Sequence, residues 1–282
     1  MKADSIALLK KLQKLEKGNS KAFSLIYPPG ISIEQSDVDD VYDRLKSMGS
    51  ADRIDLILYS YGGDADAAYK MIIVLREFCK ELRIIVPSEA KSAATLMALG
   101  ADIILMGPLS ELGPIDPVVS HPMLPVMVPA RAVLRFIEDY VTVLSESRTV
   151  EKLPFVPVDP VHMGYCRLAI DSAKEYADIL LTRYNLKGKP RTRIESVVNK
   201  LVGGGTEAYA SHSFVIDFTE AQKLGLNVEK MSDEVHDIVW QLYRTYRTDL
   251  KKLQAQKKIQ VIVETEKGRD NIIKVEPRRL YF

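Results

Sequence analysis

The sequence predicts an α/β protein in which parallel strands alternate with helices. Between residues 22 and 108, short apolar runs typical of buried strands alternate with segments whose apolar residues recur at helical spacing. Two of these strands end in turns of glycine or serine that open directly into a helix. The hydrophobic share of 46% and the charged share of 27% are ordinary for a globular protein. The alternation implies βαβ units with right-handed crossovers, and it places a functional site at the carboxyl ends of the strands.

Local signals justify each element of this region. The expected strands are apolar runs bounded by turn residues: 22–29, 53–63, 83–88 and 102–108. The expected helices carry an apolar stripe: 5–16 ahead of the first strand, then 32–49, 64–82 and 92–101. Gly49 is the expected C-cap of the helix over 32–49.

The second half of the chain predicts more helix than strand. Residues 111–133 are rich in proline and irregular, and 153–164 reads as a loop. Helical spacing predicts helices over 130–147, 165–185, 191–205 and 233–256. Residues 211–231 predict a short strand, a helix and a glycine stop, and 260–282 predicts a β-hairpin around "EKGRDN".

Composition excludes several classes of function. The 282 residues carry a net charge of +1, which argues against nucleic acid as the main partner. No apolar run reaches the roughly 20 residues of a membrane span, and the N-terminus lacks the apolar core of a signal peptide, so we expect a cytoplasmic protein without a transmembrane segment. Cys79 and Cys166 are far apart and are expected to be reduced thiols. There is no spacing typical of a metal site and no GxGxxG motif, so neither a metal nor a cofactor is expected.

Two turns of the predicted sheet carry the chemistry that the sequence offers. In "SYGGDADAA", Gly62 and Gly63 end a buried strand and open a helix, where glycine lets a substrate approach the backbone closely. In "AKSAAT", Ser92 holds the equivalent place after the next strand, so Gly63 and Ser92 are expected to be neighbours across ~5 Å of strand spacing. The amides of Gly63 and Ala93 would then hold a tetrahedral oxyanion beside the Ser92 hydroxyl, each such donor contributing about 3 kcal/mol. Each turn alone also fits a structural role, because a serine before a helix is commonly an N-cap.

These stretches resemble a known family. "LILYSYGGDADAAYKM", followed by "AKSAATLMALGADIILMGPLSELGPIDP" and by "FVIDFTEAQKLGLNV", resembles the ClpP/crotonase superfamily, and within it the serine dehydrogenase proteinase family, relatives of signal peptide peptidase A. The resemblance covers residues 22 to about 230. It implies a ClpP/crotonase-like spiral of βαβ units with additional C-terminal helices. It assigns Ser92 as nucleophile, with the oxyanion hole formed by Gly62, Gly63 and Ala93.

This resemblance divides the chain into three parts. An N-terminal helical extension covers 1–21, a ClpP/crotonase-like serine peptidase domain covers 22–232, and a C-terminal helix with a hairpin-like tail covers 233–282. Members of the superfamily usually form trimers or larger rings, so a homo-oligomer and a peptide or protein substrate are implied. The tail is expected to be able to add an edge strand to a neighbouring molecule.

The general base is where the sequence departs from the pattern. Where ClpP has its catalytic histidine, this sequence reads "GPIDP". Ser92 therefore lacks the histidine that would act as its general base. His212 lies near the place of the triad acid and is the first candidate for a base. Lys152 is the second, since relatives of signal peptide peptidase A use a downstream lysine whose pKa falls on burial. Lys91 and His121 are weaker candidates, and Asp116 is interpreted as a turn residue or as the residue that orients a base.

Three hypotheses remain at this point. The first is a serine peptidase. The second is an inactive relative that serves as an oligomeric scaffold or a peptide-binding module, which the missing histidine leaves open. The third is an acyl-CoA enzyme of the crotonase branch, against which the serine at position 92 argues.

Overall fold

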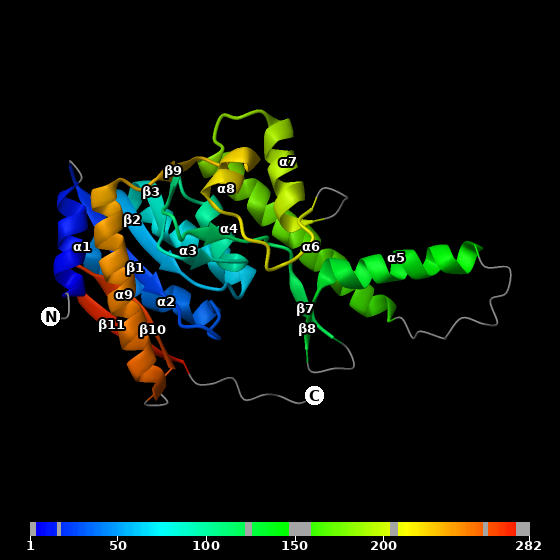
Figure 1. The fold of residues 1–282 in the computed structure, drawn as a ribbon, viewed down its shortest axis with the longest axis horizontal. Helices are drawn as coiled ribbons and strands as arrows, with labels where there is room; N and C mark the ends of the chain where they lie inside the picture. Colours follow the sequence, from blue (N-terminus) through cyan, green and yellow to red (C-terminus); the bar gives the residue numbers. More distant parts are fainter. Residues whose placement is uncertain are drawn as a thin grey trace.

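A seven-stranded sheet forms the centre of the computed structural model, which describes residues 4–15, 18–121, 126–146, 159–203, 208–255 and 259–274 (Figure 1). The strand order is β11-β10-β1-β2-β3-β5-β9. The parallel strands are β1 (Ser20–Ile26), β2 (Ala51–Tyr59), β3 (Cys79–Val86), β5 (Ile103–Met106) and β9 (Val228–Lys230). The sheet ends in an antiparallel hairpin of β10 (Ile259–Thr265) and β11 (Gly268–Lys274).

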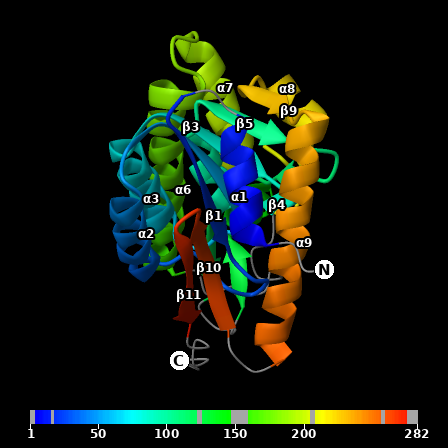
Figure 2. The ribbon, with the colours of Figure 1, turned by 90° about the vertical axis from the view of Figure 1, so that its left-hand side faces the viewer.

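Helices cover both faces of this sheet (Figure 2). One face packs against α1 (Ser5–Lys14) and α9 (Asp233–Ala255), and the other against α2 (Gln35–Met48), α3 (Ala65–Glu77) and α4 (Ala93–Leu99). Successive strand residues therefore belong to opposite cores: Ile57 and Ile85 contact the α1/α9 side, whereas Leu56 and Ile84 contact the other. Because both faces are buried, the strands are continuous apolar runs, as expected for a parallel sheet.

The region between β5 and β9 is mostly helical and includes a projecting arm. Its elements are β6 (Glu111–Leu112), β7 (Val118–Ser120), β8 (Met127–Pro129), α5 (Ala130–Glu146), α6 (Pro160–Leu180), a π-helical turn (Leu181–Asn185), α7 (Arg191–Val202) and α8 (Phe218–Leu224). In Figure 1, α5 extends away from the sheet. Its apolar side chains include Phe136 and Val141, which are both exposed. None of the helices within the described ranges is long and apolar enough to cross a bilayer.

A buried polar cluster joins the two ends of the chain to the sheet. Glu264 on β10, whose side chain is 1% exposed, accepts hydrogen bonds from Ser5 (3.0 Å), Arg269 (2.7 Å) and Tyr246 (2.6 Å). Arg269 also pairs with Asp249 at 2.8 Å. These residues come from α1, α9, β10 and β11, and we call them the terminal cluster.

The structure confirms the predicted α/β class, corrects two boundaries and shows the pairing of the terminal hairpin. The helix expected over 64–82 ends at Glu77, because residues from Cys79 onward pair with β2 in parallel register. Residues 160–164 belong to α6 and not to a loop. The hairpin expected over 260–282 is present as β10 and β11, but its edge pairs with β1 of the same chain.

Candidate active site

Ser92 lies in a strained turn at the carboxyl end of the sheet. It is the N-cap of α4 with φ 52° and ψ −120°, and it is the single non-glycine residue with positive φ in the part of the chain that the structure describes. Such a conformation costs about 1–3 kcal/mol and persists only where the surroundings enforce it. Thr95 supplies part of that enforcement, since its hydroxyl donates to Ala90 O (2.6 Å) and accepts from Gly113 N (3.0 Å). Every residue of α4 is buried, so the helix below Ser92 is held by packing.

The glycine pair lies directly against this turn. Ser60 pairs with Ala90, which holds the end of β2 beside β4 (Glu89–Ala90). A Cβ built on Gly62 would lie 2.7 Å from Ser92 Cβ, and one on Gly63 would lie 2.3 Å from the Ile33 nitrogen. Both glycines have positive φ, 109° and 149°. Gly62 therefore allows the two turns to touch, whereas Gly63, the glycine that the sequence places beside Ser92, makes room for the backbone of Ile33.

Backbone amides at this contact differ in whether they are already used. The Gly62 N–H donates to Ser60 Oγ at 3.0 Å, so its donor is taken. Within the described residues, the N–H groups of Gly63 and Ala93 have no hydrogen-bond acceptor. Ala93 is the first residue of α4, where such orphan donors are normal and the helix dipole adds positive potential. The arrangement offers the N–H groups of Gly63 and Ala93 to an anionic oxygen. Gly62 is not a third donor, but its lack of a side chain lets the Ser92 turn come close.

His212 and Asp116 form a pair between the segment that follows β6 and the segment that precedes α8. The distance from His212 Nδ1 to Asp116 Oδ1 is 2.8 Å, and Arg131 Nε lies 3.3 Å from Asp116 Oδ2. The carboxylate is 2% exposed and the imidazole 30%, so the ring reaches solvent while the acid is enclosed. Asp116 thus orients the histidine, one of the two roles that the sequence suggests for it.

Strand pairing explains how residues so distant in sequence meet. Leu112 and Ile216 form an antiparallel bridge with hydrogen bonds in both directions. This isolated bridge brings the segment of Asp116 and the segment of His212 side by side, although no further bridge joins them within the described residues. β6 also pairs with β4 in parallel, and the segment that carries Asp116 therefore runs alongside the approach to Ser92.

The remaining base candidates are placed as follows. Lys91 points away from the serine, with its ammonium 2.7 Å from Glu111 and 3.1 Å from Leu112 O. Lys152 lies outside the described residues. His121 lies beside the β7 strand and pairs through its backbone N–H with Val126 O. The Ser92 hydroxyl makes no hydrogen bond to any described residue, so the structure does not connect it to a base directly.

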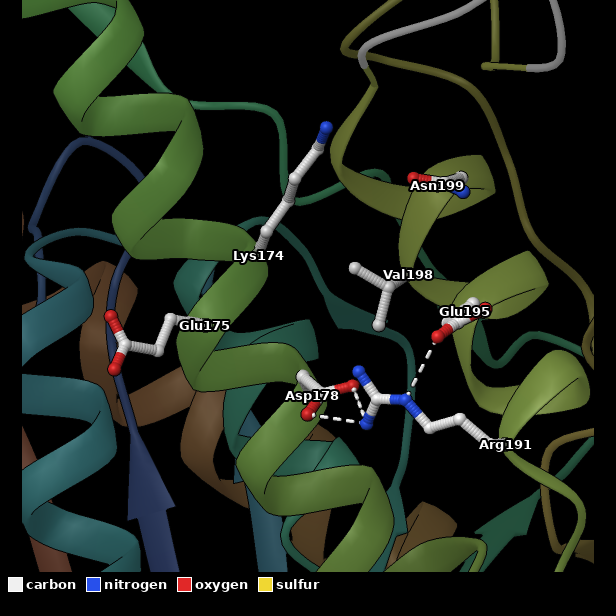
Figure 3. A pocket seen from close by; sticks show the side chains of 7 residues that line it. All are labelled: Lys174, Glu175, Asp178, Arg191, Glu195, Val198 and Asn199. Atoms are coloured by element: carbon white, nitrogen blue, oxygen red, sulfur yellow. Dashed lines mark hydrogen bonds and ion pairs between the residues drawn. The ribbon is translucent and has the colours of Figure 1, made fainter.

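Two surface hollows lie away from Ser92. One is a groove between α6 and α7, shown in Figure 3, in which Arg191 pairs with both Asp178 (2.6 Å) and Glu195 (2.9 Å). Because these two carboxylates already satisfy the charge of Arg191, the α6/α7 groove offers no free guanidinium to a ligand. The other hollow lies over α8 and includes Phe214 and Val215. In the described ranges, no group of three or more His, Cys, Asp or Glu side chains is placed to hold a metal ion.

The fold and the Ser92 turn define a ClpP-like protein of the α/β class. The chain belongs to the family of ClpP-like SDH-type serine proteinases, whose model matches residues 26–272. This match includes α9 and most of the terminal hairpin, which lie outside the stretch covered by the sequence resemblance.

Individual relatives add little to the chemistry. Uncharacterized protein MJ0137 from Methanocaldococcus jannaschii is 27% identical over 252 residues, covering 85% of this chain and 79% of that protein. Uncharacterized protein MJ1495 from the same organism is 32% identical over 91 residues, which cover 32% of this chain and 30% of that protein.

Two solved structures are similar in fold. A mutant of the 1510-N membrane-bound stomatin-specific protease is 16% identical, covers 77% of this chain and 82% of its own, and has a TM-score of 0.49. ClpP1 from Listeria monocytogenes is 15% identical, covers 75% and 94%, and has a TM-score of 0.42. The family assignment depends on the family model and not on these two structures.

Proposed function

We propose that this chain is a serine endopeptidase that hydrolyses peptide bonds with Ser92 as nucleophile. The observation that carries the proposal is the forced conformation of Ser92 beside two amides that have no acceptor in the described structure. Strain of this kind needs a reason, and presenting a hydroxyl to a substrate carbonyl is one that also explains the free amides. Family membership supports the same reaction class.

In this mechanism the Ser92 oxygen attacks the peptide carbonyl and its proton passes to a base. The base returns this proton to the amine nitrogen as the peptide C–N bond breaks, and water then hydrolyses the acyl-enzyme. The negative charge that develops on the carbonyl oxygen is held by the N–H groups of Gly63 and Ala93. Removal of one such donor typically lowers the rate by about 100- to 1000-fold. The backbone of Ile33 already lies against Gly63, and we expect a peptide substrate to bind in extended form along the open part of this turn.

We assign the base to His212, held by Asp116. A carboxylate on Nδ1 leaves Nε2 to accept the proton, and it stabilises the imidazolium that forms. The Arg131 guanidinium lies 3.3 Å from the other oxygen of Asp116 and helps to hold this carboxylate in place. The order of acid and base along the chain is the reverse of the ClpP order described by the resemblance, because Asp116 stands where the histidine is expected.

A fluorophosphonate probe tests the nucleophile. Wild-type protein should be labelled covalently, and Ser92→Ala should not be labelled. Ser213→Ala removes another exposed serine and should be labelled like wild type. If the wild-type protein remains unlabelled, the inactive scaffold or peptide-binding module becomes the better description. A coenzyme A thioester that bound in place of peptide would favour the crotonase branch.

The same probe separates the base candidates. His212→Ala should slow labelling by at least about 100-fold, the usual contribution of general-base catalysis. His121→Ala is the matched control and should have no effect. Slow labelling of Lys152→Ala, with normal labelling of His212→Ala, would move the base to the lysine.

We further propose that the chain assembles as a homo-oligomer through the α5 arm. Helix α5 has an apolar stripe at helical spacing, yet beyond Ala130 none of its residues whose exposure the structure describes is buried. Exposed apolar surface of this extent commonly marks an interface. A Phe136→Glu and Val141→Glu double variant should sediment as a smaller species than wild type, whereas Thr142→Glu should not. A cytoplasmic location stays a prediction.

A further inference from the structure

Glu89 lies on β4, between the end of β2 and the turn that carries Ser92. Its backbone oxygen accepts from Ser60 N at 3.1 Å, which fixes it next to the end of β2. Its Oε1 accepts a hydrogen bond from the Tyr61 hydroxyl at 3.3 Å. Its Oε2 is buried and has no hydrogen-bond partner among the described residues. A buried oxygen of a carboxylate without a donor is costly, so a polar partner from outside the chain is expected here.

The neighbouring lysine does not neutralise this carboxylate. Lys91 follows Glu89 by two residues, but its ammonium binds Glu111 at 2.7 Å and Leu112 O at 3.1 Å. Glu89 and Glu111 lie opposite each other in the β4–β6 pair. The β4–β6 pair therefore carries two carboxylates and one ammonium group that is already paired with Glu111. The net charge of these three side chains is negative.

An aromatic ring completes the same corner. Tyr61 packs edge to face on Tyr59 at 6.0 Å, and Tyr59 contacts Tyr243 of α9 at 5.3 Å, so the inner side of Tyr61 is held. The side chain is nevertheless 46% exposed. Burial of its inner part raises the pKa of the Tyr61 phenol, so the group stays neutral and donates to Glu89. An open aromatic face beside an anion is a setting that favours a cation.

We infer that Glu89 and Tyr61 form a specificity subsite that takes the cationic side chain of a lysine or arginine in the bound peptide. The inference deepens the proposed function and rests on it, because a peptide must lie along Gly63 for its side chain to reach this corner. Tyr61 precedes Gly62 directly and Glu89 precedes Ser92 by three residues. We therefore place the subsite next to the reacting carbonyl, where the uncompensated negative charge of the Glu89 carboxylate would attract the cation.

Binding to the full-length Ser92→Ala variant tests the subsite without hydrolysis. The probes are fluorescein-labelled nine-residue peptides of alanine and glycine, each with a single lysine moved along the peptide, and the same set with norleucine, which keeps the alkyl chain and removes the charge. At one position at least, fluorescence anisotropy should show the lysine peptide binding about tenfold or more tightly than its norleucine counterpart.

The added substitution Glu89→Gln should abolish this preference, and Glu89→Lys should reverse it toward a glutamate peptide. Glu229→Gln removes an exposed carboxylate on β9 and should preserve the preference. Gln is isosteric with Glu, and an unchanged melting temperature confirms that the fold is intact. Equal binding of both peptide sets, binding of neither set, or a preference that survives Glu89→Gln would overturn the inference.

Fluorophosphonate labelling of the wild-type protein keeps this result separate from the proposed function. Labelling without a lysine preference removes the subsite and leaves the peptidase. A lysine preference lost in Glu89→Gln, in a protein that the probe does not label, removes the peptidase and leaves a cation-selective peptide-binding site.

Discussion

The Ser92 turn and the terminal cluster are both polar features of one sheet, and they treat their polar groups in opposite ways. In the terminal cluster, the buried Glu264 carboxylate accepts hydrogen bonds from three side chains, including the guanidinium of Arg269. At the Ser92 turn, two backbone amides and one hydroxyl lack partners in the described structure, and the backbone is strained.

The difference separates stability from function within a single fold. Buried groups that satisfy each other hold segments together, and losing one member leaves an uncompensated charge. Groups left open cost stability unless a ligand completes them. Substitutions in the two regions should therefore change stability for different physical reasons. Three of them test this contrast, from the largest expected effect to the smallest, and a fourth concerns a thiol outside both regions.

The largest effect is expected from Gly63→Ala. The added Cβ would lie 2.3 Å from the nitrogen and 2.4 Å from the oxygen of Ile33, so backbone must move. We expect a loss of more than about 4 kcal/mol in the free energy of unfolding, or no folded protein. Gly188→Ala is the control, since its φ is also positive (77°) and nothing lies within 4 Å of the new Cβ. It should cost only about 1 kcal/mol, and equal losses in urea unfolding would contradict the packing argument.

Arg269→Met should come next. It leaves Glu264, which is 1% exposed, without its cation, and we expect a loss of about 3 kcal/mol in urea unfolding. Lys267→Met removes an exposed cation from the same hairpin, one that contacts Ser47 O at 2.6 Å, and should cost under about 1 kcal/mol. Below the unfolding transition, Ser92 in Arg269→Met should still react with the fluorophosphonate probe. Loss of labelling in the folded variant would mean that the two regions are coupled.

Ser92→Gly should change stability in the other direction. Glycine adopts φ 52° without steric cost, so we expect a gain of about 1 kcal/mol together with complete loss of labelling. Ser92→Ala keeps the strain and should remain close to wild type in stability. A destabilised Ser92→Gly variant would show that the turn is not strained.

The smallest effect is expected from the thiol of Cys79, the first residue of β3. Burial raises the pKa of the Cys79 thiol to about 11, above the roughly 8.5 of an unfolded cysteine. Between these values the unfolded chain holds fewer protons than the folded one, so stability is fully present below about pH 8.5 and falls as pH rises. From pH 8 to 9.5 we expect a loss of about 1 kcal/mol that Cys79→Ala lacks. Parallel unfolding curves for the two proteins at both pH values would contradict it.

The alternating pattern predicted most of the fold because it reflects local burial. The paired strands around Leu56 and Ile84 are apolar on both faces. Their apolar runs are short, which indicates strands and not helices. The helix over 64–82 was extended too far because Phe78 and Leu82 continue the helical spacing, while parallel pairing with β2 decides the outcome. The start of α6 was readable, since Asp159 and Pro160 are an N-cap and a first-turn proline.

The candidate site was only partly readable from sequence. Ser92 and the glycine pair follow strand ends, a local signal. The His212–Asp116 pair depends on the bridge between Leu112 and Ile216, which joins segments about a hundred residues apart, and no local pattern reports such pairing. Arg131 and the subsite at Glu89 were missed for the same reason, since each depends on a side chain from a different element.

The place of β10 beside β1 has a consequence for how the protein is made. β1 is synthesised well before the strand that covers its outer edge, which begins at Ile259. Until that strand emerges, the nascent chain presents a row of unpaired backbone groups, a template for aggregation. A chain that lacks the residues from 259 onward would leave this edge of β1 open, and we expect it to aggregate more readily than the full chain.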